Sequence, residues 1–331
     1  MTPPPPGAQV AILGPTAAGK SALAMELARR WGAEIVSGDS MQVYRGLDIG
    51  TAKPTPAERA EVPHHLVDIL DPPEPFNAHR FRQFADVARA GIRARGHPLI
   101  LAGGSGLYVK NWISVATMPP ADPLVAQQVW RELEAGGAAA LAAELAASDP
   151  ELAARLATNP RRLARAVEVL RLTGQSLARL VAAAESATSQ GRPPEADWLQ
   201  IVLLPEPEAH RRWIAVRCRA MLAAGWIEET QRLVQQGLLA TPTARQALGY
   251  AEIARWLEAP APGGTESLAE LLATRTWQFA RRQRTWFRHQ HPGAVPLAID
   301  ATTRLADLVC QVEAAAERWA AATAGSAFPK P

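Results

Sequence analysis

Short apolar runs alternate with longer segments of helical periodicity over most of the chain. Residues 9–13 (QVAIL) and 98–102 (PLILA) are two such runs, and a glycine follows each of them. Residues 21–31 repeat apolar side chains at helical spacing, for example at Leu23 and Leu27, so a helix is expected after the first run. Three further apolar runs are found at residues 34–36, 199–204 and 295–299. Runs of this length between helices are typical of a parallel sheet covered on both faces.

The middle of the chain has a different pattern. From about residue 112 to residue 198 it is rich in Ala, Leu, Glu and Arg without a strand pattern, and segments such as AAALAAEL and RRLARAVEVLRL favour helices. We therefore predict a helical insertion domain at residues 112–198, within a core formed by residues 1–111 and 199–331. Residues 186–197 (SATSQGRPPEAD) are expected to be a linker back to the core.

The composition is that of a globular protein rather than of a disordered or membrane chain. The 331 residues are 48% hydrophobic and 20% charged, with a formal net charge of +3, which is ordinary for such proteins. No apolar run approaches the roughly 20 residues of a membrane span, and the proline run at residues 3–6 lacks the pattern of a targeting segment. Cys218 and Cys310 have neither metal nor redox spacing, as expected for free thiols in a reducing cytosol. We expect a cytoplasmic monomer without membrane association.

A phosphate-binding loop follows the first apolar run. Residues 14–21 (GPTAAGKS) fit the pattern G-x-x-x-x-G-K-[ST] in full, and they lie between a predicted strand and a predicted helix, which is the context that this motif requires. The glycines let backbone N–H groups curl around phosphate oxygens, the lysine neutralises a diphosphate, and the serine can bind Mg²⁺. The predicted diphosphate ligands are Gly14, Thr16, Ala17, Ala18, Gly19, Lys20 and Ser21, and Ser21 is also the predicted metal ligand.

This loop does not say what the diphosphate is attached to. An ATPase or kinase of this class usually carries an Asp that holds Mg²⁺ at the end of a second apolar strand. Here the run at residues 98–102 ends in Gly103 and Gly104. The nearest acid after a predicted strand is Asp39, three residues beyond Val36.

Eight segments match one family pattern in order along the chain. They read GPTAAGKS (14–21), DSMQVYRGLDIGTAKP (39–54), PHHLVDILDP (63–72), GGSGLYV (103–109), RLARAVEVLRLTG (162–174), RCRAMLAAGWIEE (217–229), RQALGYAE (245–252) and TRTWQFARRQRTWFR (274–288). With these segments the chain resembles the tRNA dimethylallyltransferases, also called tRNA isopentenyltransferases. The resemblance implies transfer of a five-carbon prenyl group from dimethylallyl diphosphate to the exocyclic amine of the adenine on the 3′ side of the anticodon, with Mg²⁺ as cofactor. It also implies an α/β fold: a P-loop, nucleotide-kinase-like parallel sheet core flanked by helices, with an all-helical insertion domain that contacts the tRNA anticodon stem-loop.

The resemblance implies roles for single residues at the reacting centre. An allylic diphosphate loosens its C–O bond, so negative charge grows on the leaving diphosphate and donors aimed at it are the main catalysts. Lys20, the loop amides and Arg217 are the implied donors. The amine of adenine is a poor nucleophile, and Asp39 is the implied general base. Ser105 stands where the family more often has Thr, a difference that retains the hydroxyl.

The acceptor adenine must leave the stacked anticodon loop before a pocket can hold it, and contacts to the tRNA must offset that cost. Ser40 and the amide of Gln42 can read the base edge, because an amide can pair bidentately with adenine. The other contacts are implied by the family segments. The complete predicted tRNA-binding set is Asp39, Ser40, Met41, Gln42, Ser105, Arg161, Arg162, Leu163, Ala164, Arg165, Gln246, Ala247, Leu248, Gly249, Tyr250, Arg275 and Arg282.

A helix near the C-terminus is predicted to carry arginines on its apolar side. Residues at alternating spacings of four and three share one line of a helix, and here they are Leu268, Leu272, Arg275, Phe279, Arg282 and Trp286. We predict that Arg275 and Arg282 enter a cleft or form internal ion pairs. The alternative is that both extend from a packed face into solvent. Arg281, Arg284 and Arg288 are predicted to form a separate, exposed basic face that binds tRNA.

Other polar residues of the family segments have structural interpretations. Tyr44 fits a core position as well as a stacking position. Asp48 is expected to be a surface or capping residue, and Asp68 a structural acid. The adjacent His64 and His65 lack a metal partner at useful spacing, so we expect structural roles for them.

Two further expectations rest only on where residues fall within the family pattern. Thr51 and Lys53 are expected to line the entrance of the phosphate site, because the family pattern brings them near phosphates. Family members often carry a tRNA-contacting arginine where this chain has Ala126 or Gln127. Either that contact is lost or another arginine, such as Arg131, replaces it.

Three other functions share parts of the pattern. A P-loop kinase for a small metabolite has the same loop, but it would lack its second-strand Asp here. An adenylate prenyltransferase, which modifies the free nucleotide, would leave the helical insertion without a purpose. A non-catalytic RNA-binding ATPase would leave Asp39 and Ser105 unexplained.

Overall fold

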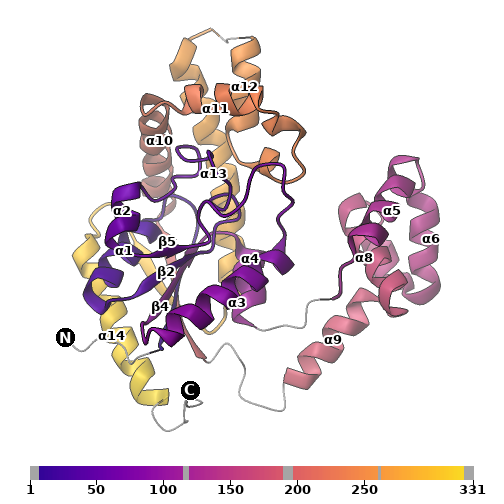
Figure 1. The fold of residues 1–331 in the computed structure, drawn as a ribbon, viewed down its shortest axis with the longest axis horizontal. Helices are drawn as coiled ribbons and strands as arrows, with labels where there is room; N and C mark the ends of the chain where they lie inside the picture. The colour runs from indigo at the N-terminus through magenta and orange to yellow at the C-terminus, as the bar shows by residue number, and fades with distance from the viewer. Residues whose placement is uncertain (1–6, 115–118, 189–196, 260–261, 324–331) are drawn as a thin grey trace. The chain divides into compact units, whose positions relative to one another are not determined.

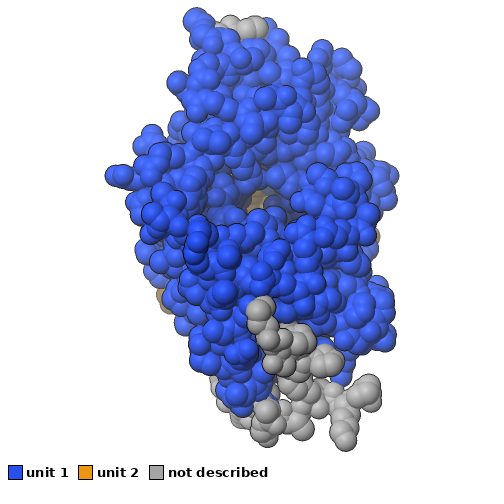
Figure 2. Space-filling model, turned by 90° about the vertical axis from the view of Figure 1, so that its left-hand side faces the viewer, with its two compact units in different colours: residues 1–113, 195–331 blue, residues 114–194 orange. Residues whose placement is uncertain are grey.

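The chain divides into two compact units. Unit 1 comprises residues 1–113 and 195–331, and unit 2 comprises residues 114–194 (Figure 2). The structure, a computed structural model, describes residues 7–114, 119–188, 197–259 and 262–323. The proline run at residues 3–6 and most of the predicted linker lie outside the described residues.

Unit 1 is built on a sheet flanked by helices (Figure 1). The sheet is parallel, with the strand order β3-β2-β4-β1-β5-β6. The strands are β1 (Gln9–Leu13), β2 (Glu34–Ser37), β3 (His64–His65), β4 (Leu99–Gly103), β5 (Trp198–Pro205) and β6 (Val295–Ile299). The five strands predicted from apolar runs are confirmed to within one residue at each end. Strand β3 was missed because two adjacent histidines carry no apolar signal.

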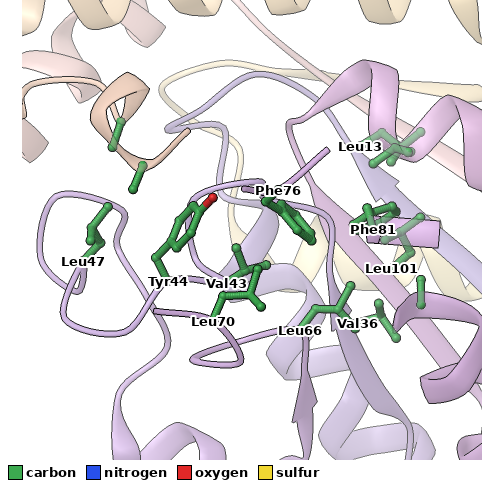
Figure 3. Close-up of a cluster of buried hydrophobic side chains, with 14 of the residues drawn as sticks. Leu13, Val36, Val43, Tyr44, Leu47, Leu66, Leu70, Phe76, Phe81 and Leu101 are labelled. Carbon is green, nitrogen blue, oxygen red and sulfur yellow. The ribbon is translucent and has the colours of Figure 1, made fainter. Parts of the chain in front are cut away.

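Alternate strand residues enter two apolar cores, one on each face of the sheet. Leu13 and Leu101 belong to a core that includes Phe81 of α3 (Figure 3), whereas Ile12 and Ile100 belong to a core that includes side chains of α1 and α14. The helices that follow the first four strands or end the chain are α1 (Lys20–Trp31), α2 (Pro56–Glu61), α3 (Ala78–Ala94), α4 (Gly106–Ile113) and α14 (Leu305–Thr323). Unit 1 is therefore a three-layer α/β fold around this sheet, as predicted.

A group of helices between β5 and β6 completes unit 1. Its elements are α10 (Pro207–Ala223), α11 (Trp226–Gln235), the short 3₁₀ turns η2 (Leu238–Ala240) and η3 (Ala244–Gln246), α12 (Tyr250–Glu258) and α13 (Gly264–Gln290). Helix α13 is 27 residues long, and it contacts α10, α12 and α4 (Figure 1). It therefore connects this helical group with the helix that follows β4.

The described part of unit 2 is helical throughout. Its helices are α5 (Pro123–Glu134), α6 (Ala138–Ser148), α7 (Pro150–Leu156), α8 (Pro160–Thr173) and α9 (Leu177–Thr188). The unit has its own core, which includes Val129, Leu141 and Val167. Helix α8 begins at a proline and is capped by Asn159, whose side-chain oxygen accepts a 3.2 Å hydrogen bond from the Arg162 N–H, as expected for such a start.

The predicted domain boundaries need a correction. Trp112 and Trp198, which the prediction assigned to the insertion, are both buried in the core of unit 1, with ring centroids 5.0 Å apart. Residues 186–188, assigned to the linker, are the last residues of α9. Among the described residues, no helix has both the length and the apolar character that a membrane crossing would need.

Candidate active site

The phosphate-binding loop joins β1 to the first turn of α1, as the motif requires. Two of its glycines have backbone angles that favour glycine, with φ of 142° at Gly14 and 82° at Gly19. A Cβ on Gly14 would lie 2.7 Å from the Leu203 carbonyl oxygen, so this glycine allows the loop to pack against β5. Gly14 was predicted as a diphosphate ligand, but it does not line the pocket beside this loop.

A pocket of about 810 Å³ lies at the carboxyl ends of β1, β2 and β4. Its walls come from the phosphate loop, residues 39–42, the turn at residues 103–105, and helices α10 and α13. Ligands of open α/β sheets commonly bind at this edge. Figure 2 shows that one face of unit 1 is hollowed near its centre.

Two cations stand beside the phosphate loop. The Lys20 ammonium donates a 2.7 Å hydrogen bond to the Pro15 carbonyl oxygen, and Arg217 donates a 3.2 Å hydrogen bond to the Thr16 hydroxyl. Burial and, to a smaller extent, nearby Arg217 lower the pKa of Lys20 to about 7, and the Asp39 carboxylate opposes both effects. Burial also lowers the pKa of Arg217. Two buried cations this close favour an anion between them.

Asp39 follows β2 and faces the same pocket. Its Oδ1 atom accepts a 2.8 Å hydrogen bond from the Met41 N–H, which orients the carboxylate within its own turn. Ser105 lies beside it on the turn after β4, where its hydroxyl accepts a 2.9 Å hydrogen bond from the Ser40 N–H and donates to the Ser40 hydroxyl at 3.1 Å. The fold therefore gathers the predicted base, hydroxyl and cations around one pocket.

Gln42 lines the pocket, but its side-chain amide is engaged within the protein. Its oxygen accepts a 2.8 Å hydrogen bond from the Ser37 hydroxyl, and its nitrogen donates to the carbonyl oxygens of Thr51 and Ala52, both at 3.2 Å. Both amide hydrogens are thus used. The prediction that Gln42 pairs bidentately with adenine is wrong for this arrangement, in which the amide connects the end of β2 to the turn at residues 49–52.

Sequence reasoning missed two side chains that hold the phosphate loop. Gln283 of α13 accepts a 2.9 Å hydrogen bond from the Thr16 N–H, so this amide, predicted to bind diphosphate, is already paired. His210 of α10 donates a 2.8 Å hydrogen bond to the Thr16 carbonyl oxygen. Both are buried. A polar residue between Ala280 and Phe287 on the buried line of a helix was the signal that could have drawn attention to Gln283.

One wall of the pocket is apolar. Ile214 and Met221 come from α10, Trp226 from the start of α11, and Phe279 from α13. Such a wall beside a cationic loop can take a ligand with an anionic head and a short hydrocarbon tail.

Comparison with known proteins decides the family. The family model described as "IPP transferase" matches residues 42–290, and the model described as "Isopentenyl transferase" matches residues 8–66. The tRNA dimethylallyltransferase of Thermus thermophilus is 43% identical over 289 residues, which cover 86% of this chain and 90% of that protein. The tRNA dimethylallyltransferase of Halorhodospira halophila is 46% identical over 288 residues, 85% of this chain and 90% of that protein.

The chain belongs to the tRNA dimethylallyltransferase family. Solved structures agree with this assignment. The tRNA isopentenylpyrophosphate transferase of Bacillus halodurans has a TM-score of 0.67 and 32% identity, over 96% of this chain and 99% of that chain. A eukaryotic dimethylallyltransferase acting on tRNA has a TM-score of 0.73 and 26% identity, over 96% of this chain and 78% of that chain.

Several residues that the family pattern assigned to tRNA contact are buried instead. The side chains of Leu163 and Ala164 are 1% and 2% exposed within the core of unit 2. Tyr250 is fully buried and donates a 2.7 Å hydrogen bond to Glu229, and Gly249 is also buried. The predicted side-chain contacts of these four residues with tRNA are therefore corrected. Core and surface positions alternate within each segment, so only some residues of a segment are accessible.

The other predicted positions of these segments are at least partly exposed or line the pocket, although Ala247 itself is 4% exposed. Arg161 and Arg162 are exposed at the start of α8. Arg165 is partly exposed, and it donates a 2.8 Å hydrogen bond to the Pro119 carbonyl oxygen and pairs with Glu168. The segment before α12 contributes three of the predicted residues to the pocket wall, namely Gln246, Ala247 and Leu248.

The arginines of α13 divide differently from the prediction. The buried side of the helix carries Leu272, Ala280, Gln283 and Phe287. After Leu272 these positions differ from the ones that the sequence predicted to face the core. Arg282 lines the pocket, with its guanidinium 5.8 Å from the centre of the Phe279 ring, but it is also exposed to solvent, so it shows features of both predicted alternatives.

Arg275 does not reach the pocket. It is half exposed and forms a long ion pair of 3.8 Å with Glu252. On the face predicted to be basic, Arg281 and Arg288 are exposed, but Arg284 is partly buried, and burial together with nearby Arg288 lowers the pKa of Arg284.

The second half of the family's longest segment is structural. The Lys53 side chain is 3% exposed, and its ammonium donates to the Tyr44 carbonyl oxygen and pairs with Asp48 and Asp68. Lys53 therefore does not line the phosphate entrance, whereas Thr51 does line the pocket. Tyr44 is a core residue, with its ring 6.5 Å from that of Phe76 (Figure 3).

The paired histidines have structural partners, as expected. His64 donates to the Val62 carbonyl oxygen, and His65 donates to Glu34, a buried acid that also pairs with Arg95. Within the described ranges, no group of three or more His, Cys, Asp or Glu side chains is arranged to hold a metal ion.

Proposed function

We propose that the chain transfers the dimethylallyl group of dimethylallyl diphosphate to the exocyclic amine of the adenine on the 3′ side of a tRNA anticodon. One observation carries this proposal. A single pocket combines a phosphate loop, two cations, a carboxylate and an apolar wall. Membership of the tRNA dimethylallyltransferase family supports the same substrates.

The donor half of the reaction uses the loop side of the pocket. The diphosphate lies between Lys20 and Arg217, and the loop amides after Thr16 donate to its oxygens. The C–O bond of the allyl group breaks with its electron pair leaving on the diphosphate oxygen. Donors already arranged around that oxygen lower the barrier, because little reorganisation is needed as charge develops.

The acceptor half uses the Asp39 side. The nitrogen lone pair of the adenine amine forms the new C–N bond with the allyl carbon. The same nitrogen then loses a proton, which the Asp39 carboxylate accepts. Ser105 and Ser40 hold the backbone of this turn through their mutual hydrogen bonds, so the base stays close to the incoming amine.

The residues fit Mg²⁺ as a partner of the diphosphate. Ser21 is exposed at the pocket wall next to Lys20, and Mg²⁺ commonly binds through one or two protein oxygens together with phosphate oxygens and waters. A bound Mg²⁺ would neutralise charge on the leaving diphosphate. This role needs no cage of acidic side chains.

Exposed basic residues supply the tRNA contacts in this proposal. Arg161 and Arg162 on unit 2, with Arg282 on α13, bind phosphates of the anticodon stem-loop. Gln246 and Leu248 approach the extruded adenine at the pocket wall.

The alternatives fit the site less well. A P-loop kinase usually carries a Mg²⁺-holding Asp at the end of a second apolar strand, but β4 ends at Gly103 and is followed by Gly104. An adenylate prenyltransferase would leave the exposed Arg161 and Arg162 at the start of α8 without a role.

One experiment separates these functions. Purified protein is incubated with labelled dimethylallyl diphosphate, Mg²⁺ and unmodified tRNA, and AMP prenylation and ATP hydrolysis are assayed in parallel. Label in tRNA, located by digestion to the adenine beside the anticodon, supports the proposal. Label only in AMP, or phosphate release from ATP without prenyl transfer, contradicts it.

A further inference from the structure

The side chain of Gln283 spans the two halves of the candidate active site. Its Oε1 atom accepts a 2.9 Å hydrogen bond from the Thr16 N–H of the phosphate loop, and its Nε2 atom donates a 2.8 Å hydrogen bond to the Gly104 carbonyl oxygen after β4. The side chain is 8% exposed. The partners lie 267 and 179 positions away in the sequence.

The Thr16 end of this connection is held from three sides. His210 donates to the Thr16 carbonyl oxygen at 2.8 Å, Arg217 donates to its hydroxyl at 3.2 Å, and Gln283 takes its N–H. The Thr16 amide is therefore not free for a diphosphate oxygen, unlike the amides that follow it. The hydrogen bond from the Thr16 N–H to Gln283 therefore holds the first part of the phosphate loop in place.

At its other end, Gln283 contacts Gly104, which is linked to the turn of Asp39 through Ser105. Gly104 precedes Ser105, whose hydroxyl accepts from the Ser40 N–H at 2.9 Å, and Ser40 follows Asp39. One amide and one hydroxyl thus join the phosphate loop to the turn that carries the carboxylate. The contact is close, since a Cβ on Gly104 would lie 2.6 Å from Gln283 Nε2.

We expect prenyl transfer to be sensitive to the distance between the phosphate loop and the turn that carries Asp39. The diphosphate oxygen and the carboxylate must act on opposite ends of one substrate pair, and a displacement of about 1 Å can lower a rate by about 100-fold. A glutamine suits the position because one amide both accepts and donates.

We propose that Gln283 is a positioning residue that sets the spacing between the diphosphate-binding loop and the turn that carries Asp39. The inference rests on the proposed prenyl transfer and adds a residue to it. Gln283 contacts the backbone of both loops rather than the reacting atoms. Its removal should therefore lower kcat more than it weakens the binding of either substrate.

The test uses two substitutions of Gln283 in the full chain. Gln283→Met removes both hydrogen bonds at similar volume, and we expect kcat to fall by about 10- to 100-fold, with tRNA Kd and the KM for dimethylallyl diphosphate changed by less than about threefold. Gln283→Glu retains an acceptor for the Thr16 N–H but donates to Gly104 only when its carboxyl is protonated. Its kcat, divided by the wild-type kcat at each pH, should rise as the pH falls, whereas this ratio stays level for Gln283→Met.

Gln200→Met is the matched control. Gln200 is also a buried amide, 7% exposed, and it accepts a 2.7 Å hydrogen bond from His291, but it does not line the pocket. We expect this variant to be less stable than the wild type and to retain its kcat.

The outcomes separate the roles clearly. If Gln283→Met keeps wild-type kcat and loses only stability, as the control does, Gln283 is structural and the proposal is overturned. If KM for dimethylallyl diphosphate rises while kcat is unchanged, Gln283 serves donor binding and the proposal is again overturned. A level pH ratio for Gln283→Glu would also contradict it. Absence of prenyl transfer by the wild-type protein would instead reject the proposed function.

Discussion

Tyr250 donates a 2.7 Å hydrogen bond to Glu229, and both side chains are buried. The same carboxylate also accepts hydrogen bonds from the backbone N–H groups of Asp48 and Ile49, at 3.1 and 2.8 Å, and of Gly50, at 3.1 Å. One buried acid thus orders the turn at residues 48–50. That turn precedes Thr51, which receives the Gln42 amide at the pocket wall.

The first prediction concerns this acid. In Glu229→Gln, an amide nitrogen that cannot accept replaces one oxygen, so two of the four donors lose their partner. Leaving buried donors unpaired costs about 1–3 kcal/mol, and more near a charge, so we expect the free energy of unfolding to fall by about 3 kcal/mol. Urea unfolding measures it. The exposed neighbour Glu228 is the control, and Glu228→Gln should change stability by less than about 0.5 kcal/mol. Equal stability of the two variants would show that the turn does not depend on Glu229.

The second prediction concerns the base. Asp39→Asn retains the acceptor for the Met41 N–H but cannot take a proton from the amine. We expect kcat to fall by about 10²- to 10⁴-fold, while tRNA Kd changes by less than about threefold. Single-turnover transfer and filter binding measure the two quantities. Asp71→Asn is the control, because Asp71 is exposed and pairs with Arg45 at the surface. Wild-type turnover in Asp39→Asn would remove Asp39 from its role.

The third prediction follows from the pKa of Lys20, which is about 7 without a ligand. Above pH 7 most Lys20 side chains are therefore neutral, and a bound diphosphate favours the protonated form. Binding of dimethylallyl diphosphate at pH 8 should take up a proton, and affinity should weaken as the pH rises from 7 to 9. Calorimetry in two buffers of different ionisation enthalpy measures the uptake. In Lys20→Arg the side chain stays charged at every pH used, so the proton uptake that Lys20 contributes should disappear. Equal proton uptake by the two proteins would show that another group takes up the proton.

The fourth prediction concerns stability at low pH. Arg95 holds the pKa of Glu34 at about 2, with further hydrogen bonds from His65 and His97. Because the folded pKa lies below the unfolded value, the stabilisation is present above about pH 4.5 and is lost as the pH falls to about 2. Glu34→Gln should lower the unfolding free energy by about 1–3 kcal/mol at pH 7, and the difference should shrink near pH 3. The exposed pair of Glu61 with Arg29 provides the control, and Glu61→Gln should change the unfolding free energy much less than Glu34→Gln does, because solvent screens an exposed pair. A difference that is constant from pH 7 to 3 would contradict the assignment.

The fifth prediction concerns the basic start of α8. Replacing Arg161 and Arg162 together with alanine should weaken tRNA binding and should lower the slope of log affinity against log salt by about 2. Neither residue has a side-chain ion pair among the described contacts, so folding should be unaffected. Arg304→Ala, at a 79% exposed position of unit 1, is the control. An unchanged salt slope in the double variant would exclude phosphate contacts at this helix.

The sequence by itself determined the sheet and the loop. Residues 9–13 and 199–204 form buried strands because continuous apolar runs can be buried only between two covering layers. Residues 14–21 form the phosphate loop because its glycines, lysine and serine act within one turn, so their spacing along the chain is already their spacing in space. Asp39, Ser105 and Arg217 came from the family resemblance, and all three line one pocket.

Only the tertiary structure decided which polar side chains serve the fold. Gln42, Lys53 and Tyr250 stand in family segments, yet each is engaged inside the protein. Gln283 and Glu229 gave weak signals in sequence, yet they hold the loops of the site. The reason is physical: a hydrogen bond depends on distance and burial, and the Gln283 amide meets a loop 267 positions away. No local pattern records which distant backbone group a buried side chain will reach.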